Sequence, residues 1–175
     1  MSLYCDYQAQ KDQSAVNMIG SLLGQVALRA VGVVGEIEKV FEKSKLRGGK
    51  GLRLAEMVEL FVKTSCSLKR VYICADGMDE LVPQHRSEFL RALRQIIQEA
   101  PNTRLFLTGR PHIRGELDKH LTRGAYTIHI VPDQGDIILY LSWKMDGDDD
   151  RDPNLMTENL RNDIMKIILE KASDM

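Results

Sequence analysis

Val71-Tyr-Ile-Cys-Ala-Asp-Gly-Met-Asp-Glu80 is the most informative segment of the chain. A second segment, Arg104-Leu-Phe-Leu-Thr-Gly-Arg-Pro111, has the same pattern of residue types. Each begins as a short apolar run that favours a β-strand and ends abruptly in charged or small polar residues. Strands of a parallel sheet have this pattern, because helices bury their apolar side chains. The two segments therefore predict neighbouring strands of a parallel α/β sheet.

Five polar residues follow the apolar parts of these segments: Asp76, Asp79, Glu80, Thr108 and Arg110. In open α/β sheets, ligands bind beyond the carboxyl ends of the strands, so we expect the five side chains to converge on one rim. Mg²⁺ takes one or two carboxylates from the protein, which suits Asp76. Asp79 or Glu80 suits a carboxylate that orients water, and Arg110 suits a cation facing a phosphate. The sequence thus predicts a nucleotide-phosphate site.

A plainer interpretation is that Asp76-Gly-Met-Asp79 is only a turn that closes a core strand, since Asp and Gly are common turn residues. Taken alone, that segment supports either interpretation equally. The second strand, which ends in Thr108-Gly-Arg-Pro111, favours the functional one.

The two segments resemble the Walker B and sensor 1 motifs of NACHT-type signalling NTPases of the STAND class. The best match is the fungal group whose domain is described as nephrocystin-3-like at its N-terminus. Residues 3–7, together with residues 13–16 and 21–25, look like the second strand of that family and the helix after it. Residues 136–141 and 160–164 look like the helices that follow the sheet. The resemblance covers nearly the whole chain.

This resemblance implies a three-layer, P-loop NTPase-like parallel sheet flanked by helices, with strand order 5-1-4-3-2. It implies a partial NTPase core over residues 1–132 and the start of a helical region over residues 133–175. It also implies Mg²⁺ and ATP or GTP as ligands, a cytoplasmic location, and protein partners or self-association through the NTPase domain.

For single residues, the resemblance implies that Asp76 is the Walker B aspartate acting on Mg²⁺, and that Asp79 and Glu80 lie near the attacking water. Arg110 would be the sensor arginine facing the terminal phosphate, with Thr108 also on the nucleotide side. The chain departs from the family at Gly109, where serine is usual.

A second departure is the phosphate loop, Gly-x-x-x-x-Gly-Lys-Ser/Thr, which surrounds a triphosphate with backbone N–H groups and a lysine. Its nearest counterpart is Arg47-Gly-Gly-Lys-Gly51, where Ser44 replaces the first glycine and Gly51 the hydroxyl residue; we interpret it as a connector between helices. In the family the loop precedes the strand at Leu3, so we expect the chain to begin just after it. The sheet would then be incomplete, without its first strand.

Each buried backbone group left unpaired by a missing central strand costs about 1–3 kcal/mol, so we expect poor independent folding. We also expect NTPase ancestry with defective nucleotide binding, and the sequence leaves open whether the chain is an enzyme. A non-catalytic remnant or protein-interaction module of the same fold is the alternative. A doubly wound domain unrelated to NTPases is a third possibility.

The composition agrees with one α/β domain: 175 residues, of which 43% are hydrophobic, with a formal net charge of -1. That charge gives no electrostatic reason to bind nucleic acid. No apolar run suits a membrane span or a secretion signal. Cys5, Cys66 and Cys74 are irregularly spaced and are expected to be buried free thiols in a reducing compartment.

Hydrophobic periodicity predicts the remaining elements. Asp146-Gly-Asp-Asp-Asp-Arg-Asp152 does not fit a calcium-binding EF-hand, because Arg151 and Thr157 stand where glycine and glutamate are needed; a solvated loop is expected. The predicted strands cover about residues 2–6, 70–75, 103–108 and 126–131, and the predicted helices about residues 13–30, 34–45, 54–65, 84–99, 113–120, 133–143 and 157–172.

Overall fold

The computed structural model describes residues 1–29, 35, 39–40, 42, 51–121, 125–131, 133–146 and 156–172. The contacts divide the chain into two compact units, Met1–Ala125 and Tyr126–Met175.

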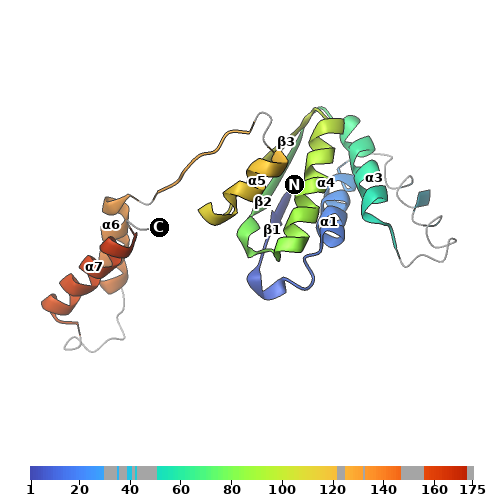
Figure 1. Ribbon diagram of the computed structural model, residues 1–175. Coiled ribbons are helices and arrows are strands. Elements are labelled where there is room, and N and C mark those ends of the chain that lie inside the picture. Colours follow the sequence, from blue (N-terminus) through green and yellow to red (C-terminus); the bar gives the residue numbers. More distant parts are fainter. Residues whose placement is uncertain are drawn as a thin grey trace. The chain divides into compact units, whose positions relative to one another are not determined.

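The first unit contains a parallel sheet of three strands, β1 (Ser2–Tyr4), β2 (Val71–Asp76) and β3 (Thr103–Leu107) (Figure 1). Their order is β1-β2-β3, so β2 lies in the centre. This neighbour order is the one that the resemblance implied for these three strands. The register aligns Leu3 with Ala75, and Ala75 with Leu107.

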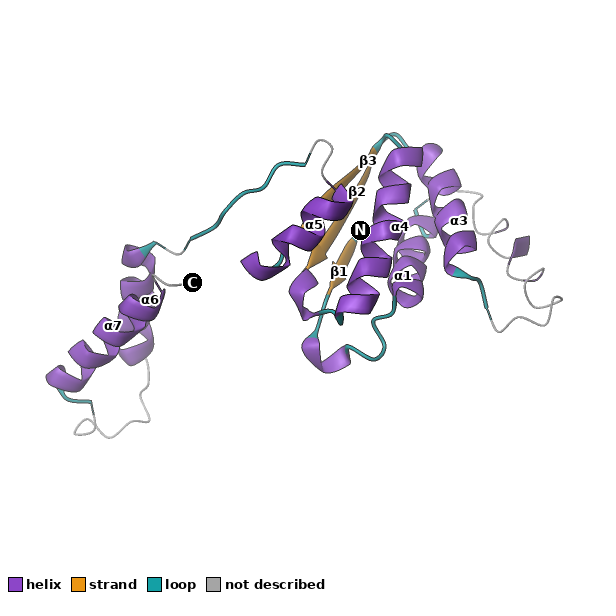
Figure 2. Ribbon diagram, in the orientation of Figure 1, coloured by secondary structure: helices purple, strands orange, loops and turns teal. Residues whose placement is uncertain are grey.

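Three helices pack together on one face of this sheet: α1 (Ala15–Ala27), α3 (Leu54–Cys66) and α4 (Pro83–Glu99) (Figure 2). Parallel strands are joined by right-handed crossovers, so a sheet that grows in one direction receives all its helices on the same face. A shorter helix, α5 (Arg114–Leu121), packs against α4. The side chains that fill the core are fully buried and come mainly from these helices and β2: Ile19, Leu22, Phe61, Ile73, Phe89, Leu90, Leu93 and Ile96.

The other face of the sheet is open in the described part of the first unit. Along β2, buried residues alternate with exposed ones. Tyr4, Tyr72 and Phe106 on this open face are 76%, 57% and 59% exposed. The predicted three-layer arrangement is therefore wrong for the described residues, which form two layers, because all their crossovers run over the same face.

Local sequence explains where the helices begin. Ser14 caps α1 by accepting a hydrogen bond from the backbone N–H of Asn17, and Pro83 occupies the first turn of α4, where its missing N–H costs nothing. The helices predicted near residues 13–30, 54–65, 84–99 and 113–120 are confirmed, with small differences at their ends. The helix predicted over residues 34–45 lies largely outside the described residues.

Three short 3-10 helices were not predicted: η1 (Tyr7–Ala9), η2 (Met78–Glu80) and η3 (Pro111–Ile113). Each directly follows a strand or the loop after it. A single turn is too short to produce a hydrophobic period, so such turns escape an analysis of periodicity.

The second unit contains the helices α6 (Gln134–Asp146) and α7 (Glu158–Ala172), which contact each other. Arg161 on α7 donates hydrogen bonds to both carboxylate oxygens of Asp146, at 2.6 and 3.3 Å. Most of the predicted acidic loop between them lies outside the described residues. None of the helices in the described ranges has the length and apolar character that crossing a bilayer requires.

The strand predicted over residues 126–131 is wrong, because this segment has no regular secondary structure. Its apolar side chains are highly exposed; those of Tyr126 and Ile130 are 96% and 87% accessible. Alternating apolar residues favour a strand only where a neighbouring strand pairs with the backbone groups. No described strand pairs with this segment.

Asn102 joins the end of α3 to the start of β3, and its substitution tests that junction. Its Nδ2 donates to the carbonyl oxygens of Ser65 and Leu68, each at 2.7 Å. Asn102→Ala leaves both acceptors without this donor, so we expect the free energy of unfolding in urea to fall by about 1–3 kcal/mol. Gln98→Ala, at an exposed position, serves as the control. Equal unfolding midpoints for both variants would contradict this role.

Candidate functional site

The carboxyl ends of β2 and β3 are joined by a set of short hydrogen bonds. The Thr108 hydroxyl donates to the carboxylate of Asp76 and accepts from the backbone N–H of Gly77 at 3.0 Å. The carbonyl oxygen of Thr108 accepts from the N–H of Met78 at 2.9 Å. Asp76 and Thr108, predicted from separate segments, are therefore direct partners.

Gly77 allows the chain to turn directly after Asp76. Its φ of 72° and ψ of 38° lie in the left-handed region, which glycine adopts without strain. A Cβ atom there would also come within 3.2 Å of the carbonyl oxygen of Cys5. The turn leads into η2 and brings Asp79 and Glu80 back toward the end of β3.

Arg110 meets both of these acidic residues. Its backbone N–H donates to Asp79 Oδ1 at 3.1 Å, and its Nε lies 3.4 Å from Asp79 Oδ2. Its Nη2 lies 3.9 Å from Glu80 Oε1. The Asp79 side chain is only 7% exposed, whereas that of Arg110 is 73% exposed. The structure thus brings all five predicted residues to one rim of the sheet.

The Cys5 thiol lies close enough to the rim for the carboxylates there to affect its pKa. The pKa of Cys5 is raised from 9.0 to about 11, mainly by burial of the thiol and, to a smaller extent, by the negative charges of Asp76, Asp79 and Glu80. A negative charge on sulfur is disfavoured where carboxylates dominate.

These residues can serve a hard cation through few protein ligands. No group of three His, Cys, Asp or Glu side chains in the described ranges is placed to hold a metal. Mg²⁺ commonly takes only one or two protein carboxylates and fills its other positions with water and phosphate. Asp76, which is exposed at the end of β2, is the residue best suited to contribute one.

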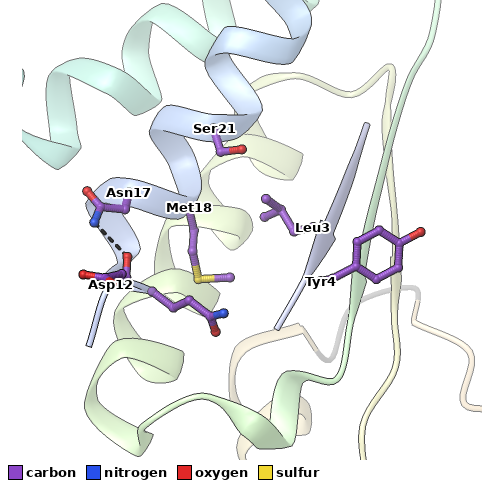
Figure 3. A pocket seen from close by; sticks show the side chains of 7 residues that line it. Leu3, Tyr4, Asp12, Asn17, Met18 and Ser21 are labelled. Carbon is purple, nitrogen blue, oxygen red and sulfur yellow. Dashed lines mark hydrogen bonds between the residues drawn. The ribbon is translucent and has the colours of Figure 1, made fainter. Parts of the chain in front are cut away.

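A small hollow lies between β1 and the N-terminal part of α1 (Figure 3). Its volume is about 150 Å³, and it is lined by Leu3, Tyr4, Asp12, Gln13, Asn17, Met18 and Ser21. Asn17 Nδ2 donates to the carbonyl oxygen of Asp12 beside it. Ligand pockets usually enclose roughly 300–1,000 Å³, so this hollow is too small for a nucleotide. None of the five predicted residues lines it.

Gly109, where the family resemblance led us to expect serine, is closely packed. A Cβ atom on Gly109 would lie 2.6 Å from Cδ1 of Ile113, a side chain that is only 2% exposed. The Ile113 side chain fills the space that a side chain at position 109 would need. Glycine fits there because it has no Cβ atom.

Sequence reasoning missed three residues that support the rim. Arg86 bonds the loop after β2, Glu116 pairs with Arg86, and Gln10 Nε2 donates to the carbonyl oxygen of Glu80 at 2.7 Å. The sequence does contain an indication for Arg86. A cation in the first turn of a helix is unfavourable, so its presence there suggests that a nearby group pairs with it. Gln10 and Glu116 gave none.

Comparison with known proteins places these features in a family. Residues 1–110 match the family described as Nephrocystin 3, N-terminal. The chain belongs to this family. The match ends at Arg110, so it includes the three strands of the sheet and all five residues of the rim. No curated protein and no solved structure matches this member of the nephrocystin 3 N-terminal family.

Substitutions at Gly109 and Ile113 test the packing at the rim. Gly109→Ala forces its Cβ against Ile113, so we expect a loss of about 1–3 kcal/mol in the free energy of unfolding. Ile113→Val removes the atom in conflict and costs about 0.5–1.5 kcal/mol by itself. Because the conflict is relieved, the double variant should lose less than the sum of the two single losses.

Gly115→Ala is the matched control for this cycle. Gly115 lies in α5, and a Cβ atom there meets nothing within 4 Å. Its substitution should stabilise the helix by up to about 1 kcal/mol. Strictly additive losses in the Gly109–Ile113 cycle, measured by urea unfolding, would show that the two positions are not in steric conflict.

The raised pKa of Cys5 has consequences for reactivity and for stability at high pH. Cys66 and Cys74 are exposed, so the prediction of buried thiols is wrong for these two residues. At pH 9 we expect iodoacetamide to modify Cys5 more slowly than Cys66 and Cys74, as mass spectrometry of digested protein would show. The folded state retains the Cys5 proton longer than the unfolded state. Its contribution to stability is therefore complete below pH 9 and is lost as the pH rises through about 11.

Cys5→Ala isolates this contribution from other groups that titrate at high pH. Its urea midpoint should fall less between pH 9 and 11 than that of the unmodified protein. Parallel decreases in the two proteins would mean that the Cys5 proton has no such effect.

Proposed function

We propose that this chain is the part of a NACHT/STAND-type signalling NTPase domain that carries the Mg²⁺ aspartate and the sensor arginine. In this proposal, nucleotide binding and hydrolysis switch the domain between states that differ in self-association. The observation that supports it is the meeting of Asp76, Asp79, Glu80, Thr108 and Arg110 at the carboxyl ends of adjacent parallel strands. Open α/β sheets bind their ligands at such a rim.

Each residue has a chemical role in this proposal. Asp76 would hold Mg²⁺, either directly or through water, and the carboxylates of Asp79 and Glu80 nearby support a cation there. Asp79 and Glu80 would orient water, and Thr108 and Arg110 would face the terminal phosphate. Bound Mg²⁺ would neutralise charge that develops on the phosphoryl oxygens.

The proposal includes weak nucleotide binding by these 175 residues alone. A phosphate loop of the form Gly-x-x-x-x-Gly-Lys-Ser/Thr supplies most of the contacts to a triphosphate in P-loop NTPases, and this sequence contains none. The rim would supply the cation and sensor contacts, while binding to the α- and β-phosphates would depend on groups outside the rim.

A non-catalytic interaction module is the second candidate, and one observation favours it. The acidic groups of the rim already have protein partners: Asp76 accepts from Thr108, and Asp79 is paired with Arg110. Carboxylates satisfied in this way do not require a metal ion to be stable. The rim would then be a structural junction, and binding would concern another protein.

Asp76→Asn distinguishes the two candidates. The amide can still accept the hydrogen bond from Thr108, so we expect nearly unchanged stability, but the charge that attracts a cation is lost. We expect weak, Mn²⁺-dependent binding of ATP or GTP to the unmodified protein, measured by titration calorimetry and by the electron paramagnetic resonance of Mn²⁺. Binding should disappear in the variant.

Two further variants sharpen the test. Asp118→Asn, at an exposed position on α5, should leave binding unchanged. Arg110→Met should weaken binding of the nucleotide while preserving binding of Mn²⁺ alone. If the unmodified protein binds no more Mn²⁺ or nucleotide than Asp76→Asn does, the non-catalytic module is the better account.

A further inference from the structure

Arg86 is a buried cation in the first turn of α4, where the helix dipole disfavours positive charge. The residue is only 8% exposed. Burying a charge costs several kcal/mol unless it is paired and fully hydrogen-bonded. Violations of local preference of this kind are concentrated at functional sites, which makes the partners of Arg86 informative.

Those partners come from both sides of the rim. On the β2 side, Arg86 Nη1 donates to the carbonyl oxygens of Leu81 at 3.1 Å and Asp79 at 3.4 Å. On the β3 side, its Nε donates to Glu116 Oε2 at 2.7 Å. Glu116 lies in α5, which continues directly from η3 and the segment that carries Arg110.

We propose that Arg86 and Glu116 are positioning residues, which hold the Asp79–Glu80 loop at a fixed separation from the Thr108–Arg110 segment. The functional relevance of this positioning rests on the proposed function, but the contacts of Arg86 and Glu116 do not depend on a bound nucleotide. The planar guanidinium reaches three acceptors at once, which a lysine ammonium on its flexible stem does less well. Arg86 donates to the backbone carbonyl oxygen of Asp79, while Arg110 pairs with the carboxylate of the same residue.

The arrangement predicts that the loop loosens when the guanidinium is removed, even where overall stability is restored. Removing one member of a buried ion pair leaves the other uncompensated and is strongly destabilising, whereas replacing both with apolar residues is often neutral. Arg86→Met together with Glu116→Leu should therefore have a melting temperature close to that of the unmodified protein. Its Asp79 and Leu81 carbonyls would still lack their donor.

The test is amide hydrogen exchange on the full chain, analysed segment by segment. In the double variant we expect the amides of residues 77–81, 109, 110, 112 and 113 to exchange at least about tenfold faster, because charged hydrogen bonds are lost. Amides in the middle of α1, at the core, should be unchanged. Arg94→Met, at an exposed position on the same helix, is the control and should alter neither set.

Arg86→Lys provides a second test if the double variant does not fold. It keeps the charge but cannot match the three acceptors, so faster exchange in the same two segments is again expected. Unchanged exchange at residues 77–81 in a folded double variant, or in Arg86→Lys, would overturn the proposal and leave Arg86 and Glu116 as an ordinary stabilising pair.

Mn²⁺-dependent ATP binding, measured on the same variants, separates this proposal from the proposed function. If the unmodified protein binds, the double variant should bind more weakly despite its normal melting temperature. If the unmodified protein does not bind, the proposed function fails, while the exchange experiment still decides the role of Arg86 and Glu116.

Discussion

Backbone hydrogen bonds between β2 and β3 fix the register of the two strands. This register places Asp76 beside Thr108, and the positions of the other rim residues depend on it. Ala75 is aligned with Leu107, so the next residue of β2 and the next residue of β3 come together. A shift by one residue would turn each side chain to the opposite face of the sheet. The buried alternation of Val71, Ile73 and Ala75 prevents such a shift, so the core of the unit and the geometry of the rim depend on the same pattern.

Apolar runs with abrupt polar ends predicted the strands β2 and β3 and the meeting of the five rim residues, whereas the order of the strands came from the family resemblance. Sequence reasoning failed at residues 126–131, where the pattern suited a strand but no described strand pairs with it. It also missed Arg86 and Glu116, which lie far apart in the chain and meet only after α4 and α5 have packed. Tertiary pairing of this kind leaves almost no trace in local composition.

The rim combines two properties that usually compete. Its acidic residues accept hydrogen bonds from protein donors, and their charges still add to the effect of burial in raising the pKa of Cys5. Arg110 is the one member of the five that combines high exposure with an ion pair, so it is the group whose contacts can change with least disturbance to the core. Asp79, by contrast, is fixed by contacts from three directions: the η2 backbone, Arg86 and Arg110.

The open face of the sheet exposes aromatic side chains to the solvent. Tyr4, Tyr72 and Phe106 line that face, and β3 ends the sheet with one edge unpaired in the described part of the chain. Exposed aromatic surface beside a free strand edge attracts other polypeptides. Whatever binds there binds the folded state alone, so by mass action it raises the apparent stability in proportion to the logarithm of its concentration. A polypeptide that bound this face would therefore make the measured free energy of unfolding depend on the concentration of that polypeptide.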